Sequence, residues 1–340
     1  MTNVAFPQAV ALELTYSCNH KCLFCSCPWY YEKNKYPIGE ELTLDSWLRV
    51  IDILFNNGIQ AFSISGGEAT LYDPMPQIVE YIHHESLKRG FDNPIVLISN
   101  GLAMKDEFLK LFRRCNVNLS MSLPGFETFA THTGVDNADG VLKWFSKAHK
   151  MGIRTTLNVT VTAKNIHELF ETISIGLING ASSVLLNRFL PGGRGLYNMK
   201  DLLLNNEQIN QMLDIAEEVL ELSNRYGSLG TEIPLCVVKN PEKYKRIKIG
   251  YKCSAAKGFF VIDPSGNIRT CNHSPRIVGH IFNTPMIEDT KYWNTFAHSQ
   301  YKPIACRGCS NLKLCDGSCR EVANILSGSP SEIDPTIKLN

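Results

Sequence analysis

The sequence predicts an α/β protein in which a parallel β-sheet curls into a full or partial barrel, followed by a smaller Cys-rich segment. Two observations carry this prediction. From about residue 9 to 190, short apolar β-rich runs alternate with amphipathic helical stretches, and beyond about residue 230 the chain is loop-rich and Cys-rich. Alternating strands and helices are typical of βα units, whose right-handed crossovers place helices outside a parallel sheet.

Each predicted strand is a short apolar run rich in β-forming residues, and each predicted helix is an amphipathic stretch. The six expected strands are Val10–Tyr16, Phe62–Ser65, Ile95–Ser99, Val117–Leu123, Thr155–Val161 and Val184–Phe189. The five expected helices between them are Ser46–Asn56, Met75–His84, Asp106–Arg114, Gly140–Met151 and Ile166–Asn179. Asn165 is suited to cap the last of these. A further helix, roughly Glu207–Tyr226, is expected to lead out of the barrel into the Cys-rich segment.

Composition excludes several classes of protein. The chain has 340 residues, and its 34 Lys and Arg nearly balance its 33 Asp and Glu, so nothing indicates a nucleic-acid or anionic-membrane partner. The N-terminus lacks the basic and apolar regions of a signal peptide, and no apolar run approaches the roughly 18–20 residues of a membrane helix. We therefore expect a cytoplasmic protein.

The 12 cysteines are the most informative residues. Ten of them lie in two terminal groups, and only Cys115 and Cys236 lie between these groups. In a reducing compartment, clustered cysteines bind metal or carry out redox chemistry. A disulfide scaffold is the alternative, but it suits small secreted chains.

The loops that follow the predicted strands are polar, Gly-rich or Cys-rich. They are residues 18–25, 66–68, 100–101, 122–125, 162–165 and 191–195. In parallel barrels and open sheets, ligands bind at the carboxyl ends of the strands. These loops are therefore expected to meet at one mouth and to form the site.

The first cysteine group is Cys18-x3-Cys22-x2-Cys25, directly after the first strand. Three thiolates can hold three irons of a [4Fe–4S] cluster and leave the fourth iron open to a cofactor. A zinc site that adds His20 or Cys27 is the alternative, although zinc usually takes paired cysteines. Cys27 falls outside the triplet and is interpreted as a spare or packing thiol.

This spacing, with Phe24 before the third cysteine, resembles the radical S-adenosylmethionine (radical SAM) superfamily. The Ile64-Ser65-Gly66-Gly67-Glu68 run after the second strand resembles that family's GGE segment. The resemblance implies a partial (β/α)6 TIM barrel in which this segment and Glu68 bind the amino group of S-adenosylmethionine. Further polar residues fall where such enzymes contact the cofactor: Ser99, Asn100, Ser120, Ser122 and Asn158.

One departure from the family concerns the cofactor carboxylate. Many relatives carry an Arg after the fourth strand, but no Arg stands between Ser122 and Gly134 here. Arg188 or Lys164 is the candidate to supply that charge from another loop. Glu127, His132 and Tyr197 also lie in the region of the site, but each is interpreted as structural.

The second cysteine group resembles the SPASM extension of radical SAM enzymes, which carries two auxiliary iron–sulfur clusters. It comprises Cys253, then Gly266 and Cys271, then Cys306-x2-Cys309-x5-Cys315-x3-Cys319. The family pattern implies that Cys253, Cys271 and Cys319 bind the first auxiliary cluster. It implies that Cys306, Cys309 and Cys315 bind the second.

The usual seventh cysteine downstream of Cys319 is absent. Asp334 stands near the expected place as a candidate oxygen ligand, and Cys236 is a candidate fourth ligand of the first auxiliary cluster. A zinc ribbon is the alternative for residues 306–319. The expected organisation is a radical SAM partial barrel (1–200), a bridging helix and linker (201–235), and a SPASM-like domain (236–340).

The resemblance implies reductive cleavage of S-adenosylmethionine to a 5′-deoxyadenosyl radical, which abstracts hydrogen from a substrate. Oxidative modification of a ribosomally made peptide, such as a cross-link, is the preferred function. Sulfatase maturation is disfavoured, because those enzymes place an Asp after the second auxiliary cysteine where Asn272 stands here. The alternatives are dehydrogenation of a sugar or aminocyclitol, and a non-catalytic metal-binding interaction protein.

The partners follow from this chemistry. The cluster requires a flavodoxin- or ferredoxin-type electron donor. The chain begins directly with the first predicted strand, so a peptide substrate is expected to need a separate leader-binding protein or no leader at all. The sequence does not single out a catalytic acid or base.

Overall fold

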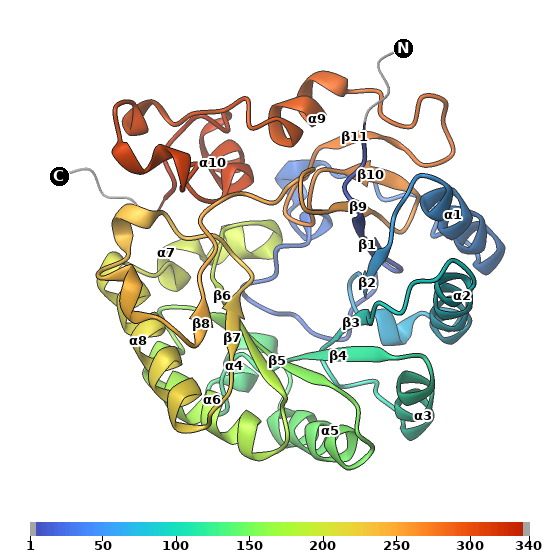
Figure 1. Ribbon diagram of the computed structural model, residues 1–340, viewed down its shortest axis with the longest axis horizontal. Helices are drawn as coiled ribbons and strands as arrows, with labels where there is room; N and C mark the ends of the chain where they lie inside the picture. The colour runs from blue at the N-terminus through green and yellow to red at the C-terminus, as the bar shows by residue number, and fades with distance from the viewer. Residues whose placement is uncertain (1–4, 336–340) are drawn as a thin grey trace.

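The computed structural model describes residues 5–335 and confirms a parallel α/β barrel that remains open (Figure 1). Six strands pair in parallel, each with its neighbour in the chain. They are β1 (Ala9–Glu13), β2 (Ala61–Ser65), β3 (Ile95–Ser99), β4 (Val117–Ser122), β5 (Thr155–Val161) and β6 (Ser183–Arg188). All six predicted strands are therefore present, with ends shifted by three residues at most.

Helices cover the outer face of the sheet (Figure 1). They are α1 (Leu44–Asn56), α2 (Met75–Lys88), α3 (Asp106–Arg114), α5 (Ala138–Lys150) and α6 (Leu169–Ile178). The Thr43 side chain accepts a hydrogen bond from the Ser46 N–H and so caps α1. A short helix that the sequence did not predict, α4 (Phe129–Thr133), lies in the loop after β4.

The Asn165 side chain was expected to cap α6, but it does not. Its Oδ1 accepts a hydrogen bond from the Thr162 N–H at 2.8 Å, and its Nδ2 donates to the carbonyls of Pro124 and Thr160. The Asn165 amide therefore ties together the loops that follow β4 and β5. Polar side chains that bond their local backbone in this way favour loops over helix interiors.

The helix after β6 does not leave the barrel, which corrects the sequence-based expectation. After the short α7 (Met199–Leu202), α8 (Asn206–Leu222) begins with a capping box between Asn205 and Gln208 and packs beside α6. The chain then returns to the sheet as β7 (Gly227–Leu229) and β8 (Ile247–Lys248), both parallel to β6. α8 is therefore a further crossover helix.

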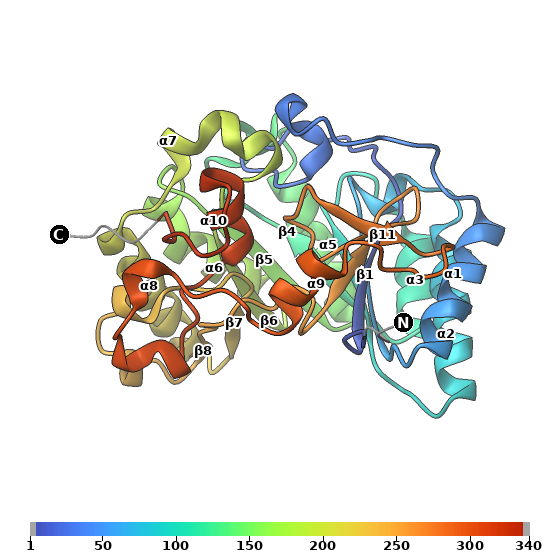
Figure 2. The same ribbon diagram turned by 90° about the horizontal axis from the view of Figure 1, so that it is seen from above.

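The Cys-rich segment joins the same sheet at its other edge. β9 (Phe260–Ile262) pairs in parallel with β1, and β10 (Asn267–Arg269) and β11 (Ile277–His280) continue the sheet in antiparallel order. Among the described residues, the sheet thus runs β11-β10-β9-β1-β2-β3-β4-β5-β6-β7-β8. Figure 2 shows this segment beside the opening of the barrel.

The C-terminal segment also shares the hydrophobic core of the barrel. Phe260 and the Trp293 ring of α9 (Thr290–Ala297) are fully buried in the main core cluster, and α10 (Arg320–Ser327) completes this segment. A segment stabilised mainly by metal was expected, so this apolar packing is an added source of stability. The domain boundaries at 200 and 236 remain a prediction.

Across residues 5–335, no helix is both long and apolar enough to cross a lipid bilayer.

Candidate iron–sulfur and S-adenosylmethionine site

The first cysteine loop lies at the carboxyl end of β1. Cys18, Cys22 and Cys25 are all half-buried and free of disulfides. The N–H groups of Lys21 and Leu23 donate hydrogen bonds of 2.8 Å to the carbonyls of Thr133 and His132. The unpredicted α4 therefore fixes the loop, because it supplies acceptors for backbone N–H groups between the cysteines.

Gly66 and Gly67 pack against the backbone that leads into Cys18. The Gly67 N–H donates to the Thr15 carbonyl at 2.8 Å, and the Glu68 N–H donates to the Ser17 carbonyl at 2.9 Å. Gly66 has φ of +133°, and a Cβ on Gly67 would overlap the Ser17 carbonyl. Only glycine allows this approach of the second strand's loop to the cysteine loop.

The Glu68 carboxylate is engaged within the protein rather than free for a ligand. Its Oε1 accepts hydrogen bonds from the Thr70 N–H, the Thr70 hydroxyl and the Ser99 hydroxyl, and its Oε2 accepts one from the Asn100 N–H at 2.7 Å. Burial raises the pKa of Glu68, and these donors oppose that shift. Glu68 therefore braces the ends of β2 and β3, and its role as a cofactor contact stays a prediction.

Asn100 connects that brace to the first cysteine. Its Nδ2 lies 2.7 Å from Asn19 Oδ1 and 3.8 Å from Cys18 Sγ. Ser99 and Asn100 are both buried, so these predicted cofactor residues orient the cysteine loop from behind.

The loop after β6 covers the third cysteine. The Gly195 N–H donates to the Cys25 carbonyl at 3.0 Å, and Arg194 donates to the Cys22 carbonyl at 3.2 Å. A Cβ on Gly193 would overlap the Cys27 carbonyl and lie 2.8 Å from the Cys25 carbonyl. The Gly-rich run after the sixth strand therefore serves close backbone packing over the cysteine loop.

Replacing Gly193 with Ala is expected to displace the cysteine loop and to lower iron binding at that loop. Gly193 has φ of +45°, and the added methyl group meets backbone that is unable to rotate away. Gly90→Ala is the matched control, because Gly90 also has positive φ and a methyl group added there would meet no atom within 4 Å. Iron content and absorbance of anaerobically prepared protein measure the effect, and equal values for the two variants would contradict this packing role.

Cys27 contacts the triplet instead of lying apart from it. A hydrogen bond from the Cys27 thiol is the main cause that lowers the pKa of Cys25, and Cys27 Sγ lies 3.8 Å from the Gly66 carbonyl. Burial raises the pKa of Cys18 to about 11 and that of Cys22 further. Iron ligands are thiolates, so cluster binding displaces these protons.

Two further residues predicted to contact the cofactor, Phe24 and Asn158, lie in different parts of the structure. The Phe24 ring lies 6.0 Å from the ring of His132, which is itself buried between the Thr128 carbonyl and the Thr162 hydroxyl. Asn158 Oδ1 accepts a hydrogen bond from Asn187 at 2.8 Å. His132 is therefore structural, as the sequence indicated.

A cavity of about 840 Å³ lies at the amino-terminal end of the barrel lumen. Its lining is mixed: apolar and aromatic residues lie beside small polar side chains and three basic residues of the β7–β8 region. The lining includes Asn118, Ser120, Thr156, Ser183, Ser228, Lys245, Arg246 and Lys248. The Ser120 hydroxyl is buried and has no hydrogen-bond partner within residues 5–335. Closed barrels fill this space with branched apolar side chains, whereas this lumen has room for a ligand.

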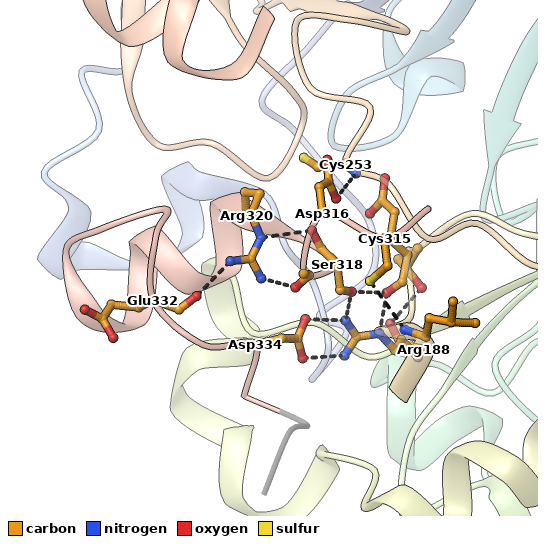
Figure 3. A network of polar contacts seen from close by, with 12 residues as sticks. Arg188, Cys253, Cys315, Asp316, Ser318, Arg320, Glu332 and Asp334 are labelled. Atoms are coloured by element: carbon orange, nitrogen blue, oxygen red, sulfur yellow. Dashed lines mark hydrogen bonds and ion pairs between the residues drawn. The ribbon is translucent and has the colours of Figure 1, made fainter. Parts of the chain in front are cut away.

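Arg188 is removed from the cofactor site by an internal ion pair (Figure 3). Its guanidinium binds both carboxylate oxygens of Asp334, at 2.7 and 3.3 Å, and also the Ser318 hydroxyl and the Glu232 carbonyl. Arg188 is 1% exposed. This corrects two expectations, because Arg188 does not face a ligand and the Asp334 carboxylate faces Arg188 instead of a cysteine.

The C-terminal cysteines differ in burial, and Cys315 is buried although its partners Cys306 and Cys309 in the second expected set are more exposed. Cys253, Cys271 and Cys319 are buried; burial raises the pKa of each, and Cys253 raises the pKa of the other two. Cys306 is half-buried and Cys309 is exposed; burial, then Cys315 and Cys309, raise the pKa of Cys306. Burial alone does not separate the two ligand sets, so their membership stays a prediction.

A buried ion pair that sequence reasoning missed joins the two cysteine regions. The Arg269 guanidinium of β10 binds the Glu13 carboxylate at the end of β1. The same guanidinium donates to the carbonyls of Asn272 at 3.1 Å and Ser274 at 2.8 Å. Burial raises the pKa of Glu13 to about 7, although Arg269 opposes that shift. A Glu inside an apolar predicted strand was the only signal of this link.

The donor sets fit iron–sulfur clusters by chemistry and placement. Across residues 5–335, no three His, Cys, Asp or Glu side chains converge tightly enough to hold a single metal ion. An iron–sulfur cluster spreads its thiolates around a cube instead of gathering them at one point. Three half-buried thiols on one loop therefore suit a [4Fe–4S] cluster, whose fourth iron would have no cysteine ligand and would be open to S-adenosylmethionine.

Comparisons with known proteins agree with this geometry. Residues 12–174 match the radical SAM superfamily. The chain is 24% identical to a PqqA peptide cyclase of Bradyrhizobium diazoefficiens and 26% identical to one of Rhodopseudomonas palustris. Each alignment covers 98% of this chain and 87% of the relative.

Solved structures share the fold. Streptococcus suis SuiB bound to S-adenosylmethionine superposes with a TM-score of 0.73 at 17% identity, over 98% of this chain and 78% of SuiB. Native anSMEcpe with bound AdoMet and Cp18Cys peptide gives 0.71 at 16% identity, over 98% and 93%.

The fold and the superfamily match define the class of protein: an enzyme with a radical SAM domain. Residues 12–174 form that domain, and the chain continues the same sheet beyond it.

Proposed function

We propose that this enzyme cleaves S-adenosylmethionine and oxidatively modifies a ribosomally made peptide. The observation that carries the proposal is the position of the three-cysteine loop directly after β1, with a cavity of mixed polar and apolar lining at the opposite end of the barrel lumen. Cys18, Cys22 and Cys25 would hold the [4Fe–4S] cluster. When bound, that cluster supplies the electron that cleaves S-adenosylmethionine and so gives access to hydrogen abstraction.

The residues of this chain orient the reactants and exclude water. Asn100 and the loop after β6 fix the cysteine loop from two sides, and Gly66 and Gly67 bring the second strand's loop against it. Hydrogen abstraction is selective only when one carbon is held at attack distance, so a rigid mouth serves the chemistry.

A peptide substrate is supported by the lumen and by the relatives. The cavity enters from the amino-terminal ends of the strands, opposite the cysteine loop, and reaches Ser120 in the middle of β4. A side chain that enters there would approach the cofactor from below. The PqqA peptide cyclases are named for a peptide, and SuiB has been solved bound to its precursor peptide SuiA.

The remaining partners follow from the chemistry. The reaction needs a low-potential one-electron donor of the flavodoxin or ferredoxin type. A separate protein would present the peptide's leader if the substrate has one. Within the described residues, which include every cysteine, no disulfide is present, and this supports a reducing cytoplasmic setting.

The test is anaerobic turnover with short peptides encoded beside the gene. Reduced enzyme is expected to release 5′-deoxyadenosine faster with the true precursor and to convert it to a product lighter by two hydrogens. Stimulation by a sugar or aminocyclitol instead, with no peptide mass change, would reject the peptide assignment.

Thr156→Phe is expected to block the peptide without harming the cofactor site. Thr156 lines the cavity, so the added ring would occupy the lumen. Peptide modification should fall on the order of 100-fold, because small misplacements of a reacting group carry costs of that size. Release of 5′-deoxyadenosine without peptide should remain. Thr295→Phe on α9 is the control, and equal effects of the two variants would contradict a substrate role for the lumen.

A further inference from the structure

We propose that Cys236 is the fourth thiolate of the second auxiliary cluster, with Cys306, Cys309 and Cys315. This inference rests on the proposed iron–sulfur function of the C-terminal cysteines. Cys236 precedes the other cysteines of this cluster in the sequence and would replace the family's usual seventh cysteine, which is absent after Cys319. From the sequence alone, Cys236 is instead a candidate ligand of the first auxiliary cluster.

The backbone around Cys236 lies directly against Cys315. Cys236 is the central residue of the 3-10 turn η6 (Leu235–Val237). The N–H of the preceding residue, Leu235, donates a hydrogen bond to Cys315 Sγ at 3.4 Å. Backbone N–H groups that point at a sulfur are a regular feature of iron–sulfur sites, where they stabilise the charged thiolate.

The turn is held in place from the barrel side. Asn210 of α8 donates from Nδ2 to the Val237 carbonyl at 2.8 Å, and its Oδ1 accepts from the Lys239 N–H at 2.7 Å. Asn210 is itself buried. Cys236 is therefore presented from a fixed turn, although its own side chain is exposed.

The electrostatic neighbours of Cys236 are the members of the second set. The cysteines near enough to interact electrostatically with Cys236 are Cys315, Cys306 and Cys309. In the first auxiliary set, by contrast, Cys253 and Cys271 raise the pKa of Cys319. The seven C-terminal cysteines thus divide into a set of four and a set of three.

Asp334, the other candidate for the fourth ligand, is bound to Arg188. Asp334 was the sequence candidate for the vacant position, but both of its carboxylate oxygens bind Arg188 inside a fully buried ion pair (Figure 3). Moving Asp334 to iron would leave the Arg188 guanidinium buried without its counter-ion, which is costly. A free thiol beside Cys315 has no such conflict.

The assignment has a consequence for the first auxiliary set. Cys253, Cys271 and Cys319 then supply three thiolates, and their acidic neighbours are Glu232, Asp316 and Glu321. One iron of that cluster is left without a cysteine.

The test compares iron content and spectra of Cys236→Ala, Arg188→Met/Asp334→Leu and Cys115→Ala in full-length protein reconstituted without oxygen. A Cys18→Ala/Cys22→Ala/Cys25→Ala background removes the first cluster, so that only auxiliary clusters contribute. Cys236→Ala is expected to lose the second cluster or to convert it to a three-iron form, with a new electron paramagnetic resonance signal. Cys236→Ser should retain a cluster with a shifted reduction potential, because oxygen replaces sulfur.

The controls make the result decisive. Cys115→Ala removes a buried thiol outside both sets and should keep the iron content and spectra of the background protein. Arg188→Met/Asp334→Leu removes the competing carboxylate without leaving a buried charge, and it should also keep the second cluster. The inference is overturned if Cys236→Ala retains those spectra, or if Arg188→Met/Asp334→Leu folds but lacks the second cluster. If the background protein itself contains no auxiliary iron, the proposed cluster function is wrong. This result differs from failure of the Cys236 assignment, because it is seen before Cys236 is replaced.

Discussion

Replacing Cys22 with Ala is expected to abolish release of 5′-deoxyadenosine from S-adenosylmethionine. Cys22 is the central thiol of the triplet, and two thiolates leave the cluster with two irons that lack protein ligands. Loss of outer-shell partners of metal ligands already costs about 10–100-fold, so loss of a ligand should cost more than about 100-fold. Product quantification under reducing, oxygen-free conditions measures the effect.

Cys27→Ala is the matched control for this variant, because Cys27 lies in the same loop and contacts Cys25. It removes a thiol of the same size from the same environment, yet it should retain most of the activity. The C-terminal iron should be unchanged in both proteins. If Cys27→Ala were inactive and Cys22→Ala active, the assignment of the triplet would be wrong.

Replacing Arg188 with Met is expected to give the largest loss of stability. The Arg188–Asp334 pair is buried at 1% and 0% side-chain exposure, and it joins the end of β6 to the loop between Cys315 and Cys319 through Ser318. Removing one partner of a buried pair leaves an uncompensated charge, which costs about 3–5 kcal/mol. Denaturant unfolding without oxygen measures the free energy.

The double variant Arg188→Met/Asp334→Leu tests that explanation. It leaves no buried charge, so part of the lost free energy of unfolding should return. A double variant as unstable as the sum of the two single variants would show that the residues act independently.

The sequence predicted the six-strand barrel well, because each strand and helix there carries its own local period. The strands β7 to β11 were missed for a physical reason. They are two to four residues long, too short to show a period, and β9 is placed by its pairing with β1 about 250 residues away. Pairing of that kind is a tertiary effect.

The cluster ligands stay a prediction from cysteine spacing, and the residues that support the cysteine loop could not be predicted from the sequence. Cysteine spacing indicated the cluster loop, whereas the roles of Glu68 and Arg188 depend on partners that no local pattern reveals. Arg188 meets Asp334 across 146 residues, and Glu68 meets Asn100 across 32. Arg188 and Glu68 fell in plausible positions for cofactor contacts, and only the fold shows that internal partners engage them.

The most direct measurement is the electron paramagnetic resonance spectrum of the reduced first cluster with and without S-adenosylmethionine. It should be recorded in a variant whose C-terminal cysteines are replaced, so that a single cluster contributes. An iron cluster held by Cys18, Cys22 and Cys25 alone should change its spectrum on addition of S-adenosylmethionine, because the nucleotide binds the free iron. A spectrum that stays the same at saturating S-adenosylmethionine would contradict an open iron and the function derived from it.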